Sequence, residues 1–564
     1  MKFLAIRNFI SIITTFLITL VITPGIHAQI TNNHQHLNIN EVEAGINVTG
    51  AIHWDFNGYD YEVPKGSGNH TVIGSALWIG GIDASGQLHG SAPTYGLGST
   101  WPGPIGSISI PFDSVSCSQF DYIWKIDKWK LEEFIHQFSI GNVTNGTYPI
   151  PQEIASWPAI GNGIVNNTLA PFIDFNGDGI YDAMDGDYPD ILGDQMLYWI
   201  YNDALQANAT GMQSMGIEVQ AKAYAYNCTN IIDSNYVMNW TTLYHYTIIN
   251  RSADVYESVY TGFWSDMDIG IASNDFAGCD TTRAAAFAYS YPDPNGYGPN
   301  PPMQNIKILR GTLADTGDGI DNDLDNTVDE PGERTTMNHF LSYLNANGTP
   351  VGNPNGGTDI YNYLRSIWLD NQPMTYGYDG RDPSAPTTNF MYSGVPYSTS
   401  GWTALNAAST PDDNRYLLSS GPVTMHAGDT LTFDIAYVFT WDSLSPNGLT
   451  TSVARNQADL DKVQYWFDTN TFPSCEVYSV GIPENAGPEN ITCFPNPAKE
   501  MVMVLAGKRQ LLDHHYTIFN LQGAEVMNGK LTSGGINVSK LSPQPYIIRI
   551  DLPGGSVTRK LVKM

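Results

Sequence analysis

The stretch that decides the fold class is Val219-Gln-Ala-Lys-Ala-Tyr-Ala-Tyr226, in which small apolar residues alternate with larger or polar ones. Successive side chains of a β-strand point to opposite faces, so a period of two predicts a strand with one face in a core. We therefore expect a half-buried strand here.

Similar runs recur along the chain, joined by turns rich in Gly, Asn, Asp and Pro. Two hairpins are predicted, one joining residues 75–82 to 87–92 and one joining residues 240–249 to 255–264. A further strand is predicted over residues 431–439, which also alternate.

Helices are expected to be few. Apolar residues recur at helical spacing from Leu131 to Phe138, behind Asp127 as a candidate N-cap, and from Val453 to Phe467. The composition agrees, because 54 Gly and 34 Pro in 564 residues are too many turn formers for a mainly helical chain. We predict a mainly β protein with one or more β-sandwich domains and few helices.

The chain is acidic, with 26 Lys and Arg against 56 Asp and Glu and a formal net charge of −30. This charge repels phosphate backbones and anionic lipid, so we expect no nucleic-acid partner. Cations are the favoured partners.

The N-terminus has the pattern of a secretory signal peptide. Lys2 and Arg7 precede an apolar run from Phe9 to Ile22, and Ala28 ends a small-residue cleavage site. The run is shorter than the roughly 20 residues of a spanning helix, so residues 1–28 predict a cleaved signal and no transmembrane anchor. For an exported protein the cysteines are few, and their pairing is left open: Cys117, Cys228, Cys279, Cys475 and Cys493.

The end of the chain has the pattern of a separate small domain. A linker containing Pro and Gly is predicted at 482–490, after a β-rich body of one or two subdomains at 29–481. Short apolar runs divided by turn residues then predict a small Ig-like β-sandwich over 491–564.

This last domain resembles the type A C-terminal sorting domain of the type IX (Por) secretion system of Bacteroidota. The matching motifs are Pro495-Asn-Pro-Ala498, Ile518-Phe-Asn-Leu-Gln-Gly523, Tyr546-Ile-Ile-Arg-Ile550 and Lys560-Leu-Val-Lys563. Pro545 departs from the family, which usually has Gly there, but a proline suits a strand-entry position. The resemblance implies a cargo of the type IX secretion machinery that is secreted or displayed on the outer-membrane surface.

The body is similar to uncharacterised secreted proteins of Bacteroidota that bear the same tail. The similar segments are spread over most of the body, at residues 61–68, 76–81, 157–159, 185–189 and 276–282. The similarity brings no known activity with it.

The clearest chemical motif is Asp174-Phe-Asn-Gly-Asp-Gly-Ile-Tyr-Asp-Ala-Met-Asp185. Its oxygen-bearing side chains have the spacing of an EF-hand-type calcium loop, and its terminal Asp is similar to the calcium loops of dockerin. An ion-free Asx turn is disfavoured, because so many neighbouring carboxylates repel one another. The predicted Ca2+ ligands are Asp174, Asn176, Asp178, Ile180, Asp182 and Asp185. Asp187, Asp190 and Asp194 follow and could complete the site or build a second one.

A second acidic stretch repeats part of this spacing and resembles the calcium repeats of thrombospondin type 3 modules. Its predicted Ca2+ ligands are Asp321, Asp323, Asp325 and Asp329, with Asn326 in place of the turn glycine.

A third acidic cluster is spaced irregularly, so both a solvated loop and a metal site are open for it. It comprises Asp266, Asp268, Asp275 and Asp280.

Sequence motifs of metalloproteases, serine hydrolases, P-loop proteins and dinucleotide-binding enzymes were not found in the chain. The sequence therefore favours a calcium-stabilised structural or adhesive protein with a glycan or another surface ligand. The alternative is a secreted polysaccharide hydrolase that uses two of the many acids.

Two further groups of side chains were considered as ligand-binding residues. Whether the protein is adhesive or a hydrolase, its tryptophan rings could stack on sugars, and the candidates are Trp78, Trp101, Trp157 and Trp199. Most tryptophans of a sandwich, however, belong to its core. His34 and His36 could catch a stray metal, but we expect them to lie in a disordered terminus.

Overall fold

The computed structural model describes residues 33–55, 58–95, 100–105, 119–159, 169–204, 211–228, 236–292, 296–398, 400–407, 409, 411–443, 449–472, 491–506, 509–520, 523–552 and 555–564. The predicted signal peptide at 1–28 and the predicted linker at 482–490 lie outside these residues.

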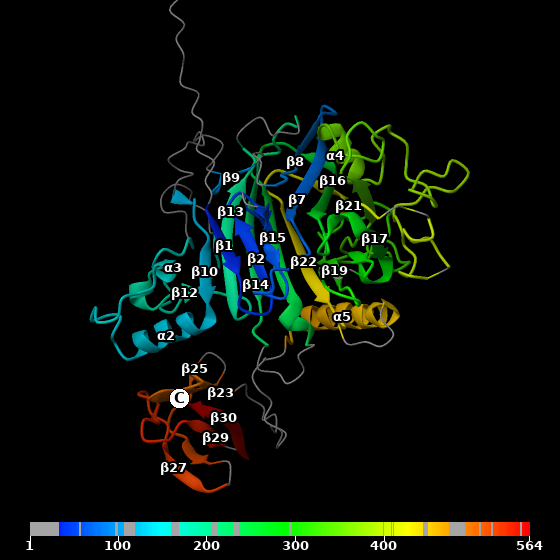
Figure 1. Ribbon diagram of the computed structural model, residues 1–564. Helices are drawn as coiled ribbons and strands as arrows, with labels where there is room; N and C mark the ends of the chain where they lie inside the picture. Colours follow the sequence, from blue (N-terminus) through cyan, green and yellow to red (C-terminus); the bar gives the residue numbers. More distant parts are fainter. Residues whose placement is uncertain are drawn as a thin grey trace, which may run out of the picture.

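The body contains two nine-stranded antiparallel sheets (Figure 1). The first has the order β1 (His34–Leu37), β2 (Glu43–Asn47), β3 (Ala51–Ile52), β7 (Gly74–Asp83), β16 (Tyr256–Asp266), β21 (Asn414–Met425) and β20 (His339–Leu344), with β6 (Tyr61–Glu62) beside β2 and β8 (Leu88–Ser91) beside β7. The second has the order β10 (Trp124–Asp127), β13 (Gln195–Asn202), β14 (Ile217–Ala225), β15 (Thr241–Asn250), β22 (Thr430–Thr440), β19 (Met303–Arg310), β18 (Ala285–Ser290) and β17 (Asp275–Asp280), with β9 (Trp101–Pro102) beside β13.

The two sheets enclose one aromatic-rich core. Phe263 of the first sheet lies with its ring centroid 5.7 Å from Tyr246 and 6.1 Å from Tyr437 of the second. Trp78 and Trp264 stack at 5.9 Å on the opposite face of the first sheet, because Trp264 follows Phe263 directly in β16. The predicted β-sandwich is confirmed, because apolar faces of both sheets are buried against each other.

A second core lies on the other face of the second sheet. It combines residues of α2 (Lys128–Ser139) and α5 (Leu449–Thr469) with sheet residues such as Tyr224. Both predicted helices are confirmed. Asp127 occupies the N-cap position of α2 as predicted, but its side chain makes no capping hydrogen bond; its carboxylate instead accepts a hydrogen bond from Gln195 at 2.6 Å. The β14 strand is confirmed, yet its predicted exposed face is buried, because this helical layer covers it.

The remaining elements are short. They are α3 (Gln152–Ala155), α4 (Gly357–Tyr363), the paired strands β4 (Trp54–Asp55) with β5 (Gly58–Tyr59) and β11 (Phe172–Ile173) with β12 (Tyr188–Pro189), and the 3-10 turns η1 (Ala183–Asp185), η2 (Val237–Trp240), η3 (Ala272–Asn274) and η4 (Thr281–Arg283).

One predicted hairpin is confirmed and the other is wrong. Strands β7 and β8 pair as expected. Strands β15 and β16 do not pair, because β15 lies in the second sheet and β16 in the first, so the chain crosses between sheets after Asn250. The link from β21 to β22 crosses in the same way, and the two crossings are joined by hydrogen bonds between Asn250 and residues 428–429.

The C-terminal residues form a small sandwich of their own. One sheet has β23 (Ile491–Phe494), β24 (Met501–Ala506), β25 (Arg509–Gln510) and β28 (Ile536–Asn537), and the other has β27 (Glu525–Lys530), β26 (His515–Phe519), β29 (Gln544–Leu552) and β30 (Gly555–Lys563). Their core is distinct from those of the body. Pro545 lies at the entry of β29, before the pairing of β29 with β26 begins at Ile547.

Motifs from the two ends of this small domain are joined directly. The Asn496 side chain accepts a hydrogen bond from the Val562 amide at 2.7 Å and donates one to the Lys560 carbonyl at 2.8 Å. The Ala498 amide donates to the Val562 carbonyl at 2.7 Å. The Pro-Asn-Pro-Ala motif thus holds the basic terminal strand in place.

The cysteines divide into bonded and unbonded groups. Cys228 is disulfide-bonded, whereas Cys279 is a buried thiol whose sulfur lies 3.3 Å from the Met391 carbonyl oxygen. Cys279 therefore takes no part in a disulfide.

Acid should destabilise the body through the buried His53. Its ring lies 2.8 Å from the Tyr244 hydroxyl and contacts Tyr61 and Tyr437, and burial lowers its pKa to about 3. Because the folded pKa is below the unfolded value of about 6.5, the stability is complete above pH 6.5 and is lost as the pH falls toward 3. Denaturant unfolding at several pH values should show this loss for the wild type and a flatter profile for His53→Asn, since Asn tolerates the positive φ of 63° at this position. Identical pH profiles would contradict the assignment.

Candidate metal centres

The first predicted calcium loop lies between β11 and β12 on the surface. The Asp174 carboxylate accepts hydrogen bonds from the Gly177 and Gly179 amides at 2.7 and 2.8 Å. Asp178 accepts one from the Ile180 amide at 2.8 Å, and Gly179 has the left-handed φ of 77° that the turn needs. The loop is therefore a tight turn whose Asn176, Asp178, Ile180, Asp182 and Asp185 are exposed.

Asp187 stabilises this loop through hydrogen bonds with two of its backbone amides. Its side chain is fully buried and accepts hydrogen bonds from the Phe175 amide at 2.8 Å and the Asp182 amide at 2.9 Å. Asp194 instead accepts a hydrogen bond from the Asn227 amide and pairs with Lys128 at 3.4 Å. Of these two later acids, only Asp187 supports the loop directly.

The second predicted loop brings three of its four acids together. Asp321, Asp323 and Asp325 each place a carboxylate oxygen within 4.8 Å of the others. Asn326 adopts the predicted left-handed conformation with φ of 76°. Asp329 is placed differently, since it accepts a hydrogen bond from the Gly319 amide at 3.3 Å.

The third acidic cluster is buried, which removes the alternative of a solvated loop. Asp266, Asp268 and Asp275 expose 1%, 3% and 0% of their surface. Oxygens of Asp266, Asp268 and Asp413 lie within 4.8 Å of one another. Asp280 is apart from them and pairs with Arg283 at 2.8 Å.

The charge of this buried cluster is not balanced by the side chains around it. In the described part of the chain, Arg415 is the cation that meets these acids, 2.7 Å from Asp266 and also against Asp413. Tyr95 donates a hydrogen bond to Asp266 at 2.6 Å. Three buried carboxylates and the partly exposed Asp413 thus share one neighbouring guanidinium group, although burial of an unpaired charge is costly.

Several oxygens of the same segment are left unsatisfied. Asp268 Oδ1, Asn274 Oδ1 and Asp275 Oδ1 are buried and have no hydrogen-bond partner among the described residues. Burial, together with the charge of Asp266, raises the pKa of Asp268 to about 8, and burial raises that of Asp275 as well. The carboxylate oxygens among them need either a proton or a cation, and an all-oxygen set suits a hard cation such as Ca2+.

The sequence predicts part of this cluster but not Asp413. Asp266, Asp268 and Asp275 lie close together in the chain, but Asp413 precedes β21 and is brought in by the pairing of β21 with β16. Its only local signal is the acidic pair Asp412-Asp413, which is common on surfaces.

Most tryptophans considered for sugar stacking are in the core. Trp78, Trp157 and Trp199 are buried, so they cannot meet a ligand from solvent. Exposed rings include Tyr376 and Tyr378 in the segment between β20 and β21.

Comparison with known proteins identifies the C-terminal unit alone. Residues 492–564 match the family model described as a secretion system C-terminal sorting domain. No curated protein matches the chain. A solved polysaccharide lyase aligns with 65% of this chain and 35% of its own length, at 8% identity and a TM-score of 0.16, which is too low to carry an argument.

The localisation follows from this match. Among the described residues, none of the helices has the length and apolar character needed to cross a bilayer. The C-terminal sandwich holds the motifs of the sorting domain on a folded unit with its own core. The chain is therefore a type IX secretion cargo protein of the kind found in Bacteroidota, exported by its C-terminal sorting domain to the extracellular space or the outer-membrane surface.

Proposed function

We propose that the body is a calcium-stabilised structural or adhesive module that acts outside the cell. The observation that carries the proposal is the cluster of buried Asp266, Asp268 and Asp275 with the partly exposed Asp413, which has unsatisfied oxygens and one contacting guanidinium group. A calcium ion would neutralise these acids and fill its own coordination sphere with their oxygens.

The position of the cluster explains how calcium would stabilise the body. Asp266 ends β16 and Asp413 precedes β21, both in the first sheet, whereas Asp275 begins β17 in the second sheet. An ion bound by acids of both sheets would link them at this end of the sandwich. The exposed loops at 174–185 and 321–329 would take further ions and stabilise the surface locally.

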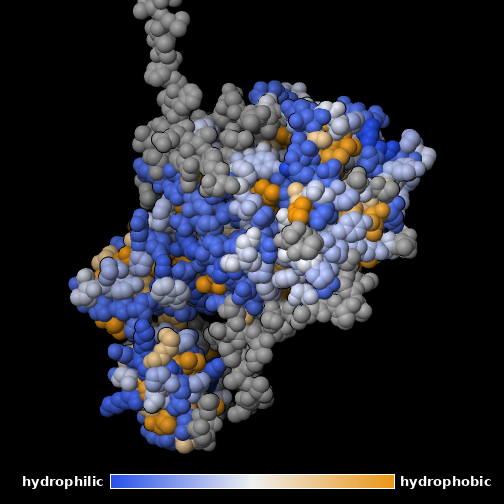
Figure 2. Space-filling model, viewed as in Figure 1, coloured by the Kyte–Doolittle hydropathy of each residue, from blue (hydrophilic) through white to orange (hydrophobic). Residues whose placement is uncertain are grey.

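The surface also agrees with a soluble structural role. The face seen in Figure 2 is mostly hydrophilic, with hydrophobic residues scattered in small areas. Together with the net charge of −30, this surface disfavours aggregation. A glycan or another surface ligand is the proposed partner class, and Tyr376 and Tyr378 are exposed rings that could stack on sugars.

A polysaccharide hydrolase is the alternative, and the pocket beside β2 and β6 is the place to test it. Glu43, Asp60 and Glu62 line this pocket, but its volume is only about 200 Å3, below the roughly 300–1,000 Å3 of small-molecule sites. Both Asp60 oxygens are also bound to histidines. A polysaccharide hydrolase needs a cleft that accepts a sugar chain between two free carboxylates. The small volume of this pocket and the histidine-bound Asp60 both disfavour that arrangement.

Binding and cleavage can be separated in one experiment. The purified chain should co-sediment with insoluble polysaccharides or bacterial envelopes in calcium and lose that binding in chelator, without releasing reducing ends. The Tyr378→Ala variant tests the role of this exposed ring in binding. The matched control is Tyr465→Ala, which removes another exposed tyrosine, on α5. Release of reducing ends by the wild type would contradict the adhesive proposal and support the hydrolase.

A further inference from the structure

Two histidines that were expected in a disordered terminus lie in an ordered strand. His34 and His36 belong to β1, which pairs with β2 along its whole length. Because they are two residues apart in a strand, their side chains project from the same face. Their ring centroids lie 4.5 Å apart.

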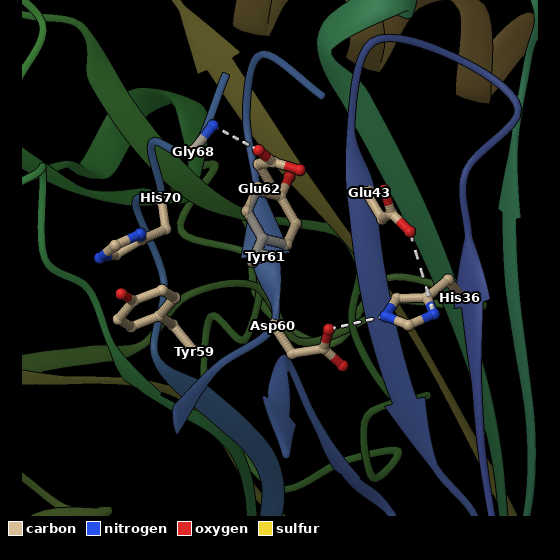
Figure 3. A pocket seen from close by; sticks show the side chains of 8 residues that line it. All are labelled: His36, Glu43, Tyr59, Asp60, Tyr61, Glu62, Gly68 and His70. Carbon is tan, nitrogen blue, oxygen red and sulfur yellow. Dashed lines mark hydrogen bonds and ion pairs between the residues drawn. The ribbon is translucent and has the colours of Figure 1, made fainter. Parts of the chain in front are cut away.

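Asp60 approaches both imidazole rings from a different segment. One of its oxygens lies 2.7 Å from His36 Nε2, and the other contacts His34 Nε2. Figure 3 shows the Asp60 carboxylate pointing at the His36 ring. The three side chains are partly buried, and their ligand atoms all lie within 4.8 Å of one another.

Room for this carboxylate depends on a glycine. Gly45 of β2 is the direct partner of His36, and a Cβ atom on Gly45 would lie 1.3 Å from Asp60 Oδ2. The Gly45 amide also donates a hydrogen bond to the Asp60 carbonyl at 2.7 Å. Sheet register and a missing side chain therefore fix Asp60 between the histidines.

The outer nitrogen of His36 faces a second acid. His36 Nδ1 lies 4.0 Å from Glu43 Oε1, on the side opposite Asp60 (Figure 3). A carboxylate behind the ring is the usual arrangement for a metal-bound histidine, because it orients the imidazole and raises its basicity.

We propose that His34, His36 and Asp60 bind a divalent transition metal ion such as Zn2+, with a coordination position open to the adjoining pocket. The ligand set is two imidazole nitrogens and one carboxylate, which suits zinc and related ions and does not suit calcium. In a tetrahedral site with bonds of about 2 Å, ligand atoms lie about 3.3 Å apart, so small movements of the rings would admit the ion.

The pocket defines what could reach the open position. It is lined by His36 and Asp60 at one end and by Tyr59, Glu62 and His70 elsewhere (Figure 3). Tyr59 and His70 stack at 3.4 Å and form an aromatic wall. A small ligand with a metal-binding oxygen or nitrogen fits this volume of about 200 Å3, whereas a polymer chain does not.

Cobalt(II) provides a direct test, because its visible absorption reports coordination by protein nitrogen and oxygen. Titration of the full chain with Co2+ should give a saturable tetrahedral spectrum that Zn2+ abolishes and that excess Ca2+ leaves unchanged. His36→Ala and Asp60→Asn should each remove the spectrum, while His426→Ala, which alters an exposed His–Asp pair elsewhere, should preserve it.

A second variant separates metal binding from a hydrogen-bond network. Glu43→Gln keeps the ligands and should weaken Zn2+ binding about 10- to 100-fold. Thermal melts in chelator show whether each variant is folded. If the wild type gives no tetrahedral spectrum, or if folded His36→Ala and Asp60→Asn proteins give the wild-type spectrum, the three residues are a hydrogen-bond network only and the proposal is wrong.

Discussion

Removing calcium should lower the melting temperature of the body, and Asp268→Asn should abolish this dependence on calcium. An ion that binds only the folded chain adds RT ln(1 + [L]/Kd), about 2.7 kcal/mol per site at a hundredfold excess over Kd. Without calcium, Asp268→Asn should be no less stable than the wild type, because it removes one of several crowded buried acids. With calcium, it should be clearly less stable. Melting curves recorded in calcium and in chelator check both expectations.

Two further variants show which part of the body depends on calcium. Asp178→Ala should increase hydrogen exchange in the segment 174–194, as chelation does, because it removes a central acid of the exposed loop. Asp382→Asn alters an exposed Asx turn outside the three acidic clusters and should leave the calcium dependence unchanged. A wild-type melting curve that is the same in calcium and chelator would refute the calcium proposal and leave the acids free for other chemistry.

Deleting residues 491–564 should trap the protein in the periplasm. The sorting domain has its own core, so the deletion leaves the two cores of the body intact while removing the export signal. Fractionation of a host with a type IX system should find the full chain at the surface or in the medium and the truncated chain in the periplasm.

A point variant makes the export test finer. Asn496→Ala should reduce surface delivery, because the Asn496 side chain ties the opening motif to the terminal basic strand. Lys540→Ala lies on an exposed turn of the same domain and serves as the control. Normal surface delivery of the chain that ends before residue 491 would show that the body carries its own signal.

The local elements of this protein were predictable because they depend on short-range periodicity. The strand at 217–225, the helices α2 and α5 and the small C-terminal sandwich all follow from patterns repeated within a few residues. The turn glycine of the 174–185 loop was predictable for the same reason.

Pairing and burial, by contrast, were decided by the tertiary structure. Strands β15 and β16 look like a hairpin in the sequence, but a short turn can also carry the chain from one sheet to the other, and only the neighbouring strands determine which occurs. The tertiary structure also decided which side chains meet at the candidate metal sites. Asp413 lies close to Asp266 because strand β21 pairs with β16. Asp60 lies close to His34 and His36 because of the register of β1 and β2 and because Gly45 leaves room for its carboxylate. The sequence by itself determined the elements, the export domain and the excess of acids, whereas the convergence of distant side chains came from long-range packing that no local pattern records.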